Sequence, residues 1–160
     1  MLYADSSALV KRYLEERGSD SLNAKIAKTT KARHSVLTSV LSFAEVHAAM
    51  ARKLRESPPL RATEYHWATT RFSSDWRTYL TRVELTTDVL NLIPNLAKRH
   101  VLRGCDAVHL ASALWIRESI ESVGAKGALA EALIFATSDK QLARAAEYEQ
   151  LEVFDPEDAL

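Results

Sequence analysis

The stretch MLYADSSALVKRY, residues 1–13, decides the fold because an apolar segment runs directly into a carboxylate and then into a helix. Residues 2–4 suit a short buried strand, which places Asp5 at the carboxyl end of that strand. Ser6 or Ser7 is expected to cap the helix that follows by accepting hydrogen bonds from its first amides. Ligands of open α/β sheets bind at the carboxyl ends of the strands, so Asp5 is either a helix cap or a ligand.

Composition indicates one domain without a general affinity for polyanions. With 160 residues, 47% of them hydrophobic, the chain is long enough for one substantial core, and we expect a single domain over residues 1–160. The 21 Lys and Arg balance the 21 Asp and Glu, which excludes the basic field of a general nucleic-acid binder. Cys105 is the single cysteine, so no intrachain disulfide forms, and it is expected to be a small buried residue. No apolar run approaches the roughly 20 residues of a membrane span and no secretory leader opens the chain, so a cytoplasmic protein is expected.

Short apolar segments alternate with helical patterns along the rest of the chain. Further strands are predicted at residues 36–38, 83–86, 134–137 and 152–154. Helical spacing predicts helices over residues 19–26, 39–54, 62–80, 88–100, 104–119 and 139–148, and Gly124 and Gly127 indicate a loop between residues 119 and 133. This alternation implies the α/β class, with a parallel sheet covered by helices on both faces.

Four acidic residues are expected at the carboxyl edge of that sheet. Asp5 follows the first strand, Glu45 lies about two turns into the helix after the second, Asp106 lies in the first turn of helix 104–119, and Asp139 follows the fourth strand. Each alone has a structural explanation, because an acid in a first helical turn gains ~0.3 to 1 kcal/mol from the helix dipole. Together they require a cation, since two carboxylates ~4 Å apart repel by about 4 kcal/mol at an effective dielectric of 20.

Oxygen ligands without a Cys/His set favour Mg²⁺ or Mn²⁺ over zinc. His109, three residues after Asp106, is expected to be a packed helix residue rather than a ligand or base. Lys11 and Arg12 lie one to two turns beyond the first acid, where they either contact substrate phosphates or pair with Glu15.

An aromatic stripe in the helix expected over residues 62–80 is interpreted as amphipathic core, although part of it could dock a partner. The stripe consists of Tyr65, Phe72, Trp76 and Tyr79.

Four segments resemble, in order and at the expected intervals, the motifs of PIN-domain nucleases, and within that family the VapC-type toxins of toxin–antitoxin pairs. They are residues 5–13 (DSSALVKRY), 42–46 (SFAEV), 102–113 (LRGCDAVHLASA) and 135–139 (FATSD). The resemblance covers essentially the whole chain and implies a five-stranded parallel sheet flanked by helices. It further implies that Asp5, Glu45, Asp106 and Asp139 are the metal-binding and catalytic acids, with Ser7 as a supporting hydrogen-bonding residue.

The resemblance also implies an activity and partners. VapC-type proteins are Mg²⁺-dependent endoribonucleases, usually homodimers, held inactive by a cognate antitoxin. The expected activity is therefore hydrolysis of RNA phosphodiester bonds with Mg²⁺, for which Mn²⁺ could substitute. The alternatives are a stand-alone PIN-domain RNA-processing nuclease and a non-catalytic PIN scaffold that binds a partner or RNA. A phosphoacceptor receiver domain is disfavoured because it needs an acidic pair after the first strand, where Ser6 and Ser7 follow Asp5.

Overall fold

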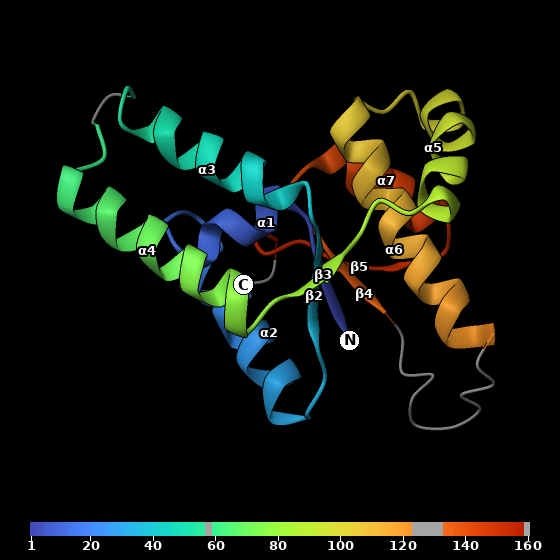
Figure 1. Cartoon of the computed structure of the whole chain (residues 1–160), viewed down its shortest axis with the longest axis horizontal. Coiled ribbons are helices and arrows are strands. Elements are labelled where there is room, and N and C mark those ends of the chain that lie inside the picture. Colours follow the sequence, from blue (N-terminus) through green and yellow to red (C-terminus); the bar gives the residue numbers. More distant parts are fainter. Residues whose placement is uncertain (57–58, 123–132, 159–160) are drawn as a thin grey trace.

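The computed structural model describes residues 1–56, 59–122 and 133–158 and has a five-stranded parallel sheet at its centre (Figure 1). The strand order is β3-β2-β1-β4-β5, and each neighbouring pair is parallel. The strands are β1 Leu2–Ala4, β2 Val36–Ser39, β3 Thr81–Val83, β4 Ile134–Ala136 and β5 Glu152–Phe154. The predicted α/β class and five-stranded parallel sheet are confirmed.

Helices cover both faces of the sheet, as the alternation of strands and helices predicts. They are α1 Ser6–Leu9 with the 3₁₀ turn η1 Val10–Arg12, α2 Ser19–Lys31, α3 Ser42–Lys53, α4 Ala62–Thr78, α5 Thr87–His100, α6 Gly104–Ser122 and α7 Lys140–Tyr148. Helices α1 to α4 pack with one hydrophobic cluster, and α5 to α7 pack with a second (Figure 1). No helix in these described ranges is both long and apolar enough to span a membrane.

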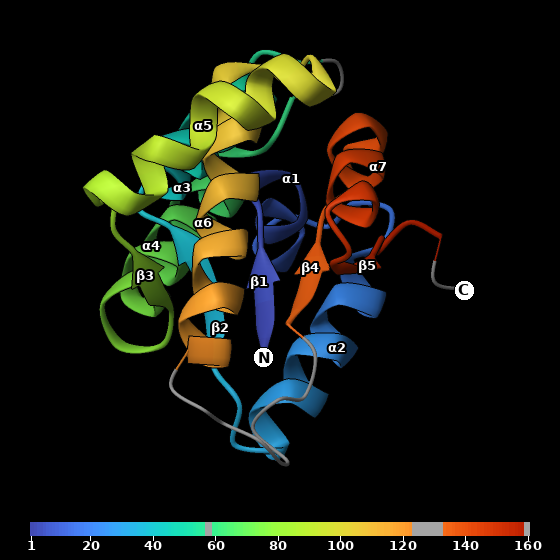
Figure 2. The ribbon, with the colours of Figure 1, turned by 90° about the vertical axis from the view of Figure 1, so that its right-hand side faces the viewer.

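Strand β1 lies in the middle of the sheet and runs from the N-terminus towards α1 (Figure 2). Leu2 and Ala4 belong to the cluster under α1 to α4, whereas Tyr3 belongs to the cluster under α5 to α7. This split follows from the two-residue period of a strand, which sends successive side chains to opposite faces. Tyr3 stacks on Phe135 of β4, with ring centroids 5.4 Å apart. The buried strand therefore delivers the next residue, Asp5, to the carboxyl edge of the sheet.

Several predicted boundaries were displaced, and helix α2 runs on to Lys31 instead of ending near residue 26. Strand β3 begins at Thr81 instead of residue 83, and Thr86 is not part of it because its side chain caps α5 by accepting a hydrogen bond from Val89 N. Helix α3 begins at Ser42, later than expected, because Val40 N still donates to Val83 O (3.0 Å) and so prolongs the pairing of the sheet. Glu45 consequently lies in the first turn of α3, not two turns into it.

Two further expectations have clear outcomes, and one lies outside the described ranges. The aromatic stripe of α4 is core, because Phe72 is fully buried and Tyr65, Trp76 and Tyr79 pack against the same cluster. Cys105 is exposed rather than buried, because it lies in the first turn of α6 at the edge of the sheet. The predicted loop at residues 119–133 falls largely on residues 123–132, which are not described.

Candidate active site

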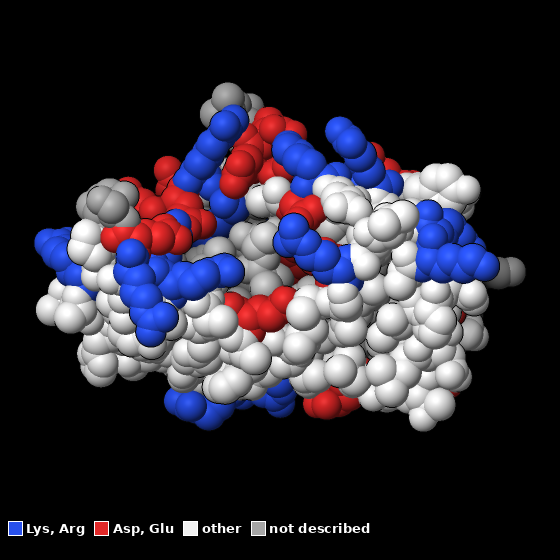
Figure 3. All heavy atoms as spheres, turned by 90° about the horizontal axis from the view of Figure 1, so that it is seen from above, with Lys and Arg blue, Asp and Glu red and all other residues white. Residues whose placement is uncertain are grey.

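The four predicted acids line one cavity of about 460 Å³. They reach it from four elements: Asp5 after β1, Glu45 in the first turn of α3, Asp106 in the first turn of α6, and Asp139 as the N-cap of α7. Figure 3 looks onto this side of the molecule and shows acidic side chains around a central hollow, with Lys and Arg side chains near it. The fold thus brings together residues that lie up to 134 positions apart in the sequence.

Asp5 is held rigidly by donors on three sides. Its Oδ1 accepts hydrogen bonds from Ala8 N (2.8 Å) and Ser7 Oγ (2.9 Å), and its Oδ2 accepts from Thr137 Oγ1 (2.8 Å). Burial raises the pKa of Asp5, an effect opposed by His109 and by these hydrogen bonds. Asp5 therefore caps α1, and the expectation that Ser6 or Ser7 would cap this helix was wrong. The cap and the cavity position are compatible because a carboxylate offers about four lone-pair directions.

Ser7 lines the cavity and makes hydrogen bonds there. Besides donating to Asp5, its hydroxyl accepts a hydrogen bond from Ser138 N (2.9 Å). It thereby ties the segment after β1 to the segment after β4, which carries Asp139. The relative position of these two carboxylates is fixed by this bridge.

Glu45 is oriented by a buried network that ends in the core. Its Oε2 accepts hydrogen bonds from Ser6 Oγ (2.5 Å) and His109 Nε2 (2.8 Å), and His109 Nδ1 lies 3.0 Å from Tyr3 OH. Burial raises the pKa of Tyr3, so its hydroxyl stays protonated. An ionised carboxylate can only accept, so Nε2 is the donor to Glu45, and in the tautomer with the proton on Nε2 the Tyr3 hydroxyl donates to Nδ1. Burial would raise the pKa of Glu45, but the hydrogen bonds from His109 and Ser6 outweigh it and lower that pKa. Glu45 is therefore ionised, and His109 is the residue that positions it.

His109 is buried, as expected of a packed helix residue, but its hydrogen bond to Glu45 was not predicted from the sequence. The spacing could have indicated that His109 lies near the acids, since residues three apart on a helix share a face and Asp106 is three residues earlier.

Replacing His109 with Phe is expected to lower the free energy of unfolding by about 1 to 3 kcal/mol. The substitution leaves the buried Tyr3 hydroxyl without its acceptor and removes a donor from Glu45. Urea denaturation measures the loss. The matched control is His66→Phe, because His66 is exposed on α4 and should change the midpoint little. Equal midpoints for both variants would show that the buried network contributes nothing.

Asp106 and Asp139 supply the open oxygens of the cavity. Within the described chain the carboxylate of Asp106 accepts no hydrogen bond, and Asp139 uses only Oδ1, which caps α7 by accepting from Gln141 N (2.8 Å) and Leu142 N (3.0 Å). Burial and the negative charge of Asp139 raise the pKa of Asp106, although nearby Arg103 opposes this. Two facing acids that disfavour each other's charge are a setting that a cation stabilises.

The donor set fits a hydrated hard cation. As the side chains lie, no three His, Cys, Asp or Glu residues among those described are grouped to hold a metal ion on their own. Mg²⁺ commonly needs only one or two carboxylates because it keeps several of its water molecules. Ser138 also lines this cavity, but its Oγ is buried and has no hydrogen-bond partner in the described structure. The residues therefore suit Mg²⁺ or Mn²⁺ with a partly retained water shell.

The two cations proposed from the sequence as phosphate contacts have different environments. Lys11 lines the acid cavity, but its Nζ pairs with Glu157 Oε1 (2.7 Å) and with Glu16 Oε2 (3.6 Å). Arg12 does not line this cavity; its Nε pairs with Asp75 Oδ2 (2.9 Å). Neither of these ion pairs involves Glu15, the partner that helical spacing suggested.

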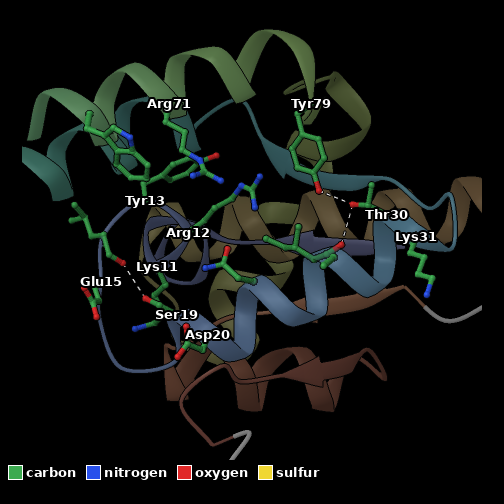
Figure 4. Close-up of a pocket in the computed structure, with 15 residues that line it drawn as sticks. Lys11, Arg12, Tyr13, Glu15, Ser19, Asp20, Thr30, Lys31, Arg71 and Tyr79 are labelled. Atoms are coloured by element: carbon green, nitrogen blue, oxygen red, sulfur yellow. Dashed lines mark hydrogen bonds between the residues drawn. The ribbon is translucent and has the colours of Figure 1, made fainter. Parts of the chain in front are cut away.

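Arg12 instead lines a larger hollow of about 820 Å³ that contains none of the four acids. Figure 4 shows Arg12 and Arg71 reaching into it, with Tyr79 and Thr30 joined by a hydrogen bond (2.8 Å) at one side. The size of a cavity therefore does not identify the chemical site here, and we assign the chemistry to the smaller cavity on the basis of its carboxylates.

Comparisons with known proteins agree with this architecture. No family model matches the chain. Two curated relatives from Mycobacterium tuberculosis, Ribonuclease VapC45 (strain CDC 1551 / Oshkosh) and Ribonuclease VapC49 (strain ATCC 25618 / H37Rv), are each 37% identical over 122 residues, which is 71% of this chain and 75% of the relative.

Solved structures share the fold at low sequence identity. FitAcB from Neisseria gonorrhoeae superposes with a TM-score of 0.62 at 16% identity and covers 98% of both chains. VapBC2 from Rickettsia felis, bound to a DNA fragment from their promoter, has a TM-score of 0.58 at 11% identity and covers 97% of this chain and 98% of that chain. PAE2754 from Pyrobaculum aerophilum has a TM-score of 0.58 at 19% identity and covers 98% of this chain and 89% of that chain.

Proposed function

This chain belongs to the VapC family of PIN-domain proteins, and from that premise we propose that it is a metal-dependent endoribonuclease and the toxin of a toxin–antitoxin pair. The observation that carries the proposal is the convergence of four carboxylates, from four separate elements, on one cavity. The name ribonuclease of both curated relatives supports hydrolysis of RNA phosphodiester bonds as the reaction.

We assign the cation, Mg²⁺ with Mn²⁺ able to substitute, to the open oxygens of Asp106 and Asp139. Asp5 and Glu45 complete the site, directly or through water. When bound, such a cation makes a water molecule more acidic and neutralises charge on the attacked phosphate and the leaving oxygen.

The chain's own residues hold the acids in place and handle the proton. Asp5 stays fixed because Ala8, Ser7 and Thr137 all donate to it. Glu45 is ionised and accepts a proton from the attacking water as general base. The hydrogen bond from His109 keeps the Glu45 side chain in one conformation at the cavity, so the base is already positioned before the reaction begins. The proposed catalytic set is therefore Asp5, Glu45, Asp106 and Asp139, with Ser7 in support.

The proposed partners are RNA in the cytoplasm, a cognate antitoxin protein and a second copy of this chain in a homodimer. The solved VapBC2 and FitAcB structures support the antitoxin. Co-expression with a small reading frame adjacent to this one tests that partner, because the proposal requires the two products to co-purify and the small one to suppress cleavage.

Incubation of the purified protein with single-stranded RNA tests the activity. We expect fragments in Mg²⁺, no fragments after chelation with EDTA, and recovery when Mg²⁺ or Mn²⁺ is restored, because the carboxylates need the cation. Cleavage that continues in EDTA would contradict the metal-dependent mechanism. RNA binding without cleavage in every metal would instead favour the non-catalytic scaffold.

A further inference from the structure

Two arginines that line the acid cavity have no ion pair in the described part of the chain. They are Arg52, in the last turn of α3, and Arg103, immediately before α6. Both side chains are exposed. Arg103 lies near enough to Asp106 to oppose the rise in its pKa, but no ion pair is formed. An exposed guanidinium group outside an ion pair can bind an anion at little desolvation cost.

The other two described cations of this cavity are neutralised within the protein. Lys11 is only 5% exposed and pairs with Glu157 (2.7 Å). Lys53 Nζ pairs with Glu16 Oε1 and Glu56 Oε2, each at 3.0 Å. An anion that binds either lysine must displace a carboxylate, so we assign these lysines to intramolecular ion pairs and not to ligand binding.

The two arginines come from opposite helix layers. Helix α3 belongs to the layer that covers one face of the sheet, and α6 belongs to the layer that covers the other (Figures 1 and 2). Arg52 and Arg103 therefore line the same cavity from elements of opposite layers. A polyanion that crosses the cavity from one helix layer to the other therefore meets an arginine of each layer.

We propose that Arg52 and Arg103 bind the two RNA phosphates that flank the phosphate at the acids, so that a single strand crosses the cavity from α3 to α6. The inference rests on the proposed function and names the residues that position its substrate. The need for them is electrostatic, because four carboxylates repel a nucleic-acid backbone. The guanidinium fork matches a phosphate in a bidentate way that a lysine cannot reproduce.

Fluorescence anisotropy with a labelled single-stranded RNA tests this in an Asp5→Asn background with EDTA present, so that the RNA stays intact during the measurement. We expect Arg52→Ala and Arg103→Ala each to weaken RNA binding by about three- to tenfold and to reduce the slope of log affinity against log salt by about 0.7. Arg52→Lys and Arg103→Lys should recover the salt slope but only part of the affinity. The matched control is Arg144→Ala, because Arg144 is an exposed arginine of α7 outside the cavity lining.

Unchanged RNA affinity and salt slope in both alanine variants would overturn the inference. An equal loss of affinity in Arg144→Ala would also overturn it, because the effect would then come from the net charge of the protein and not from the two positions. A loss of antitoxin binding with intact RNA binding would also overturn it, since the arginines would then contact protein. Urea midpoints check folding, and Mn²⁺ titration of the two variants in the otherwise wild-type chain should match the parent. If the parent itself neither binds nor cleaves RNA, the proposed function fails together with the inference. If the parent cleaves RNA but the arginine variants bind RNA as tightly as it does, the inference alone fails.

Discussion

Replacing Asp5 with Asn is expected to reduce Mg²⁺-dependent RNA cleavage by about a hundred- to a thousandfold while the protein stays folded. Asn preserves the shape of the side chain and removes its negative charge, so the cavity loses one of four carboxylates. It also retains one acceptor oxygen for the amide of Ala8, which keeps α1 capped. Burial opposes the charged form of Asp5, so the neutral amide offsets part of the cost of the lost Thr137 hydrogen bond.

Initial rates of RNA fragment release in Mg²⁺ measure this effect, and the midpoint of urea unfolding monitors the fold. Asp88→Asn is the matched control, because Asp88 is an exposed acid in the first turn of α5 and does not line the cavity. The control should cleave at the parental rate. A folded Asp5→Asn variant that does the same would remove Asp5 from the site.

The substitution Phe135→Ala is expected to lower the free energy of unfolding by about 3 to 5 kcal/mol. Phe135 is fully buried in β4, directly beside the central strand β1, and stacks on Tyr3. Truncation removes both its burial and this ring contact, and the rigid sheet and helices around it limit how far the space can collapse. Tyr3 is hydrogen-bonded to His109, and His109 is hydrogen-bonded to Glu45. Looser packing around Tyr3 should therefore disturb the position of Glu45 and slow cleavage.

Guanidinium denaturation of parent and variant yields the difference. Leu90→Ala is the control, because Leu90 is 47% exposed on α5 and should lose less than about 1 kcal/mol. A loss at residue 135 no larger than the loss at residue 90 would show that β4 is not packed as described.

Four of the five strands could be predicted to within about one residue, because their apolar runs are short and end at polar residues. Strand β3 was predicted too late in the sequence because it is an edge strand with two exposed polar residues, Thr81 and Arg82. Its first buried apolar residue is Val83, where the predicted strand began. Strand β3 ends at Val83, and Thr86 instead caps the helix that follows, a role that depends on that helix.

That the four acids meet at one edge of the sheet could be predicted, because Asp5 and Asp139 directly follow strands and Asp106 lies in a first helical turn. Glu45 was expected a turn deeper in its helix than it lies. The contacts that support the four acids could not be predicted. The partner of Lys11 is Glu157, 146 residues away, and His109 meets Glu45 only because α6 and α3 come together at the sheet edge. That Arg52 and Arg103 form no ion pair with any described residue is likewise a property of the folded surface, since it depends on which carboxylates come within reach.

The most direct test of the central claim, that the carboxylates share one divalent cation, is calorimetric titration of Mn²⁺ into the parent and Asp106→Asn. The parent should show saturable binding. Asp106→Asn should bind at least about tenfold more weakly, because it lacks a carboxylate that accepts no hydrogen bond from the residues the structure describes. Asp88→Asn should match the parent. Equal Mn²⁺ affinity in Asp106→Asn and the parent, or no binding to the parent at millimolar Mn²⁺, would contradict the account.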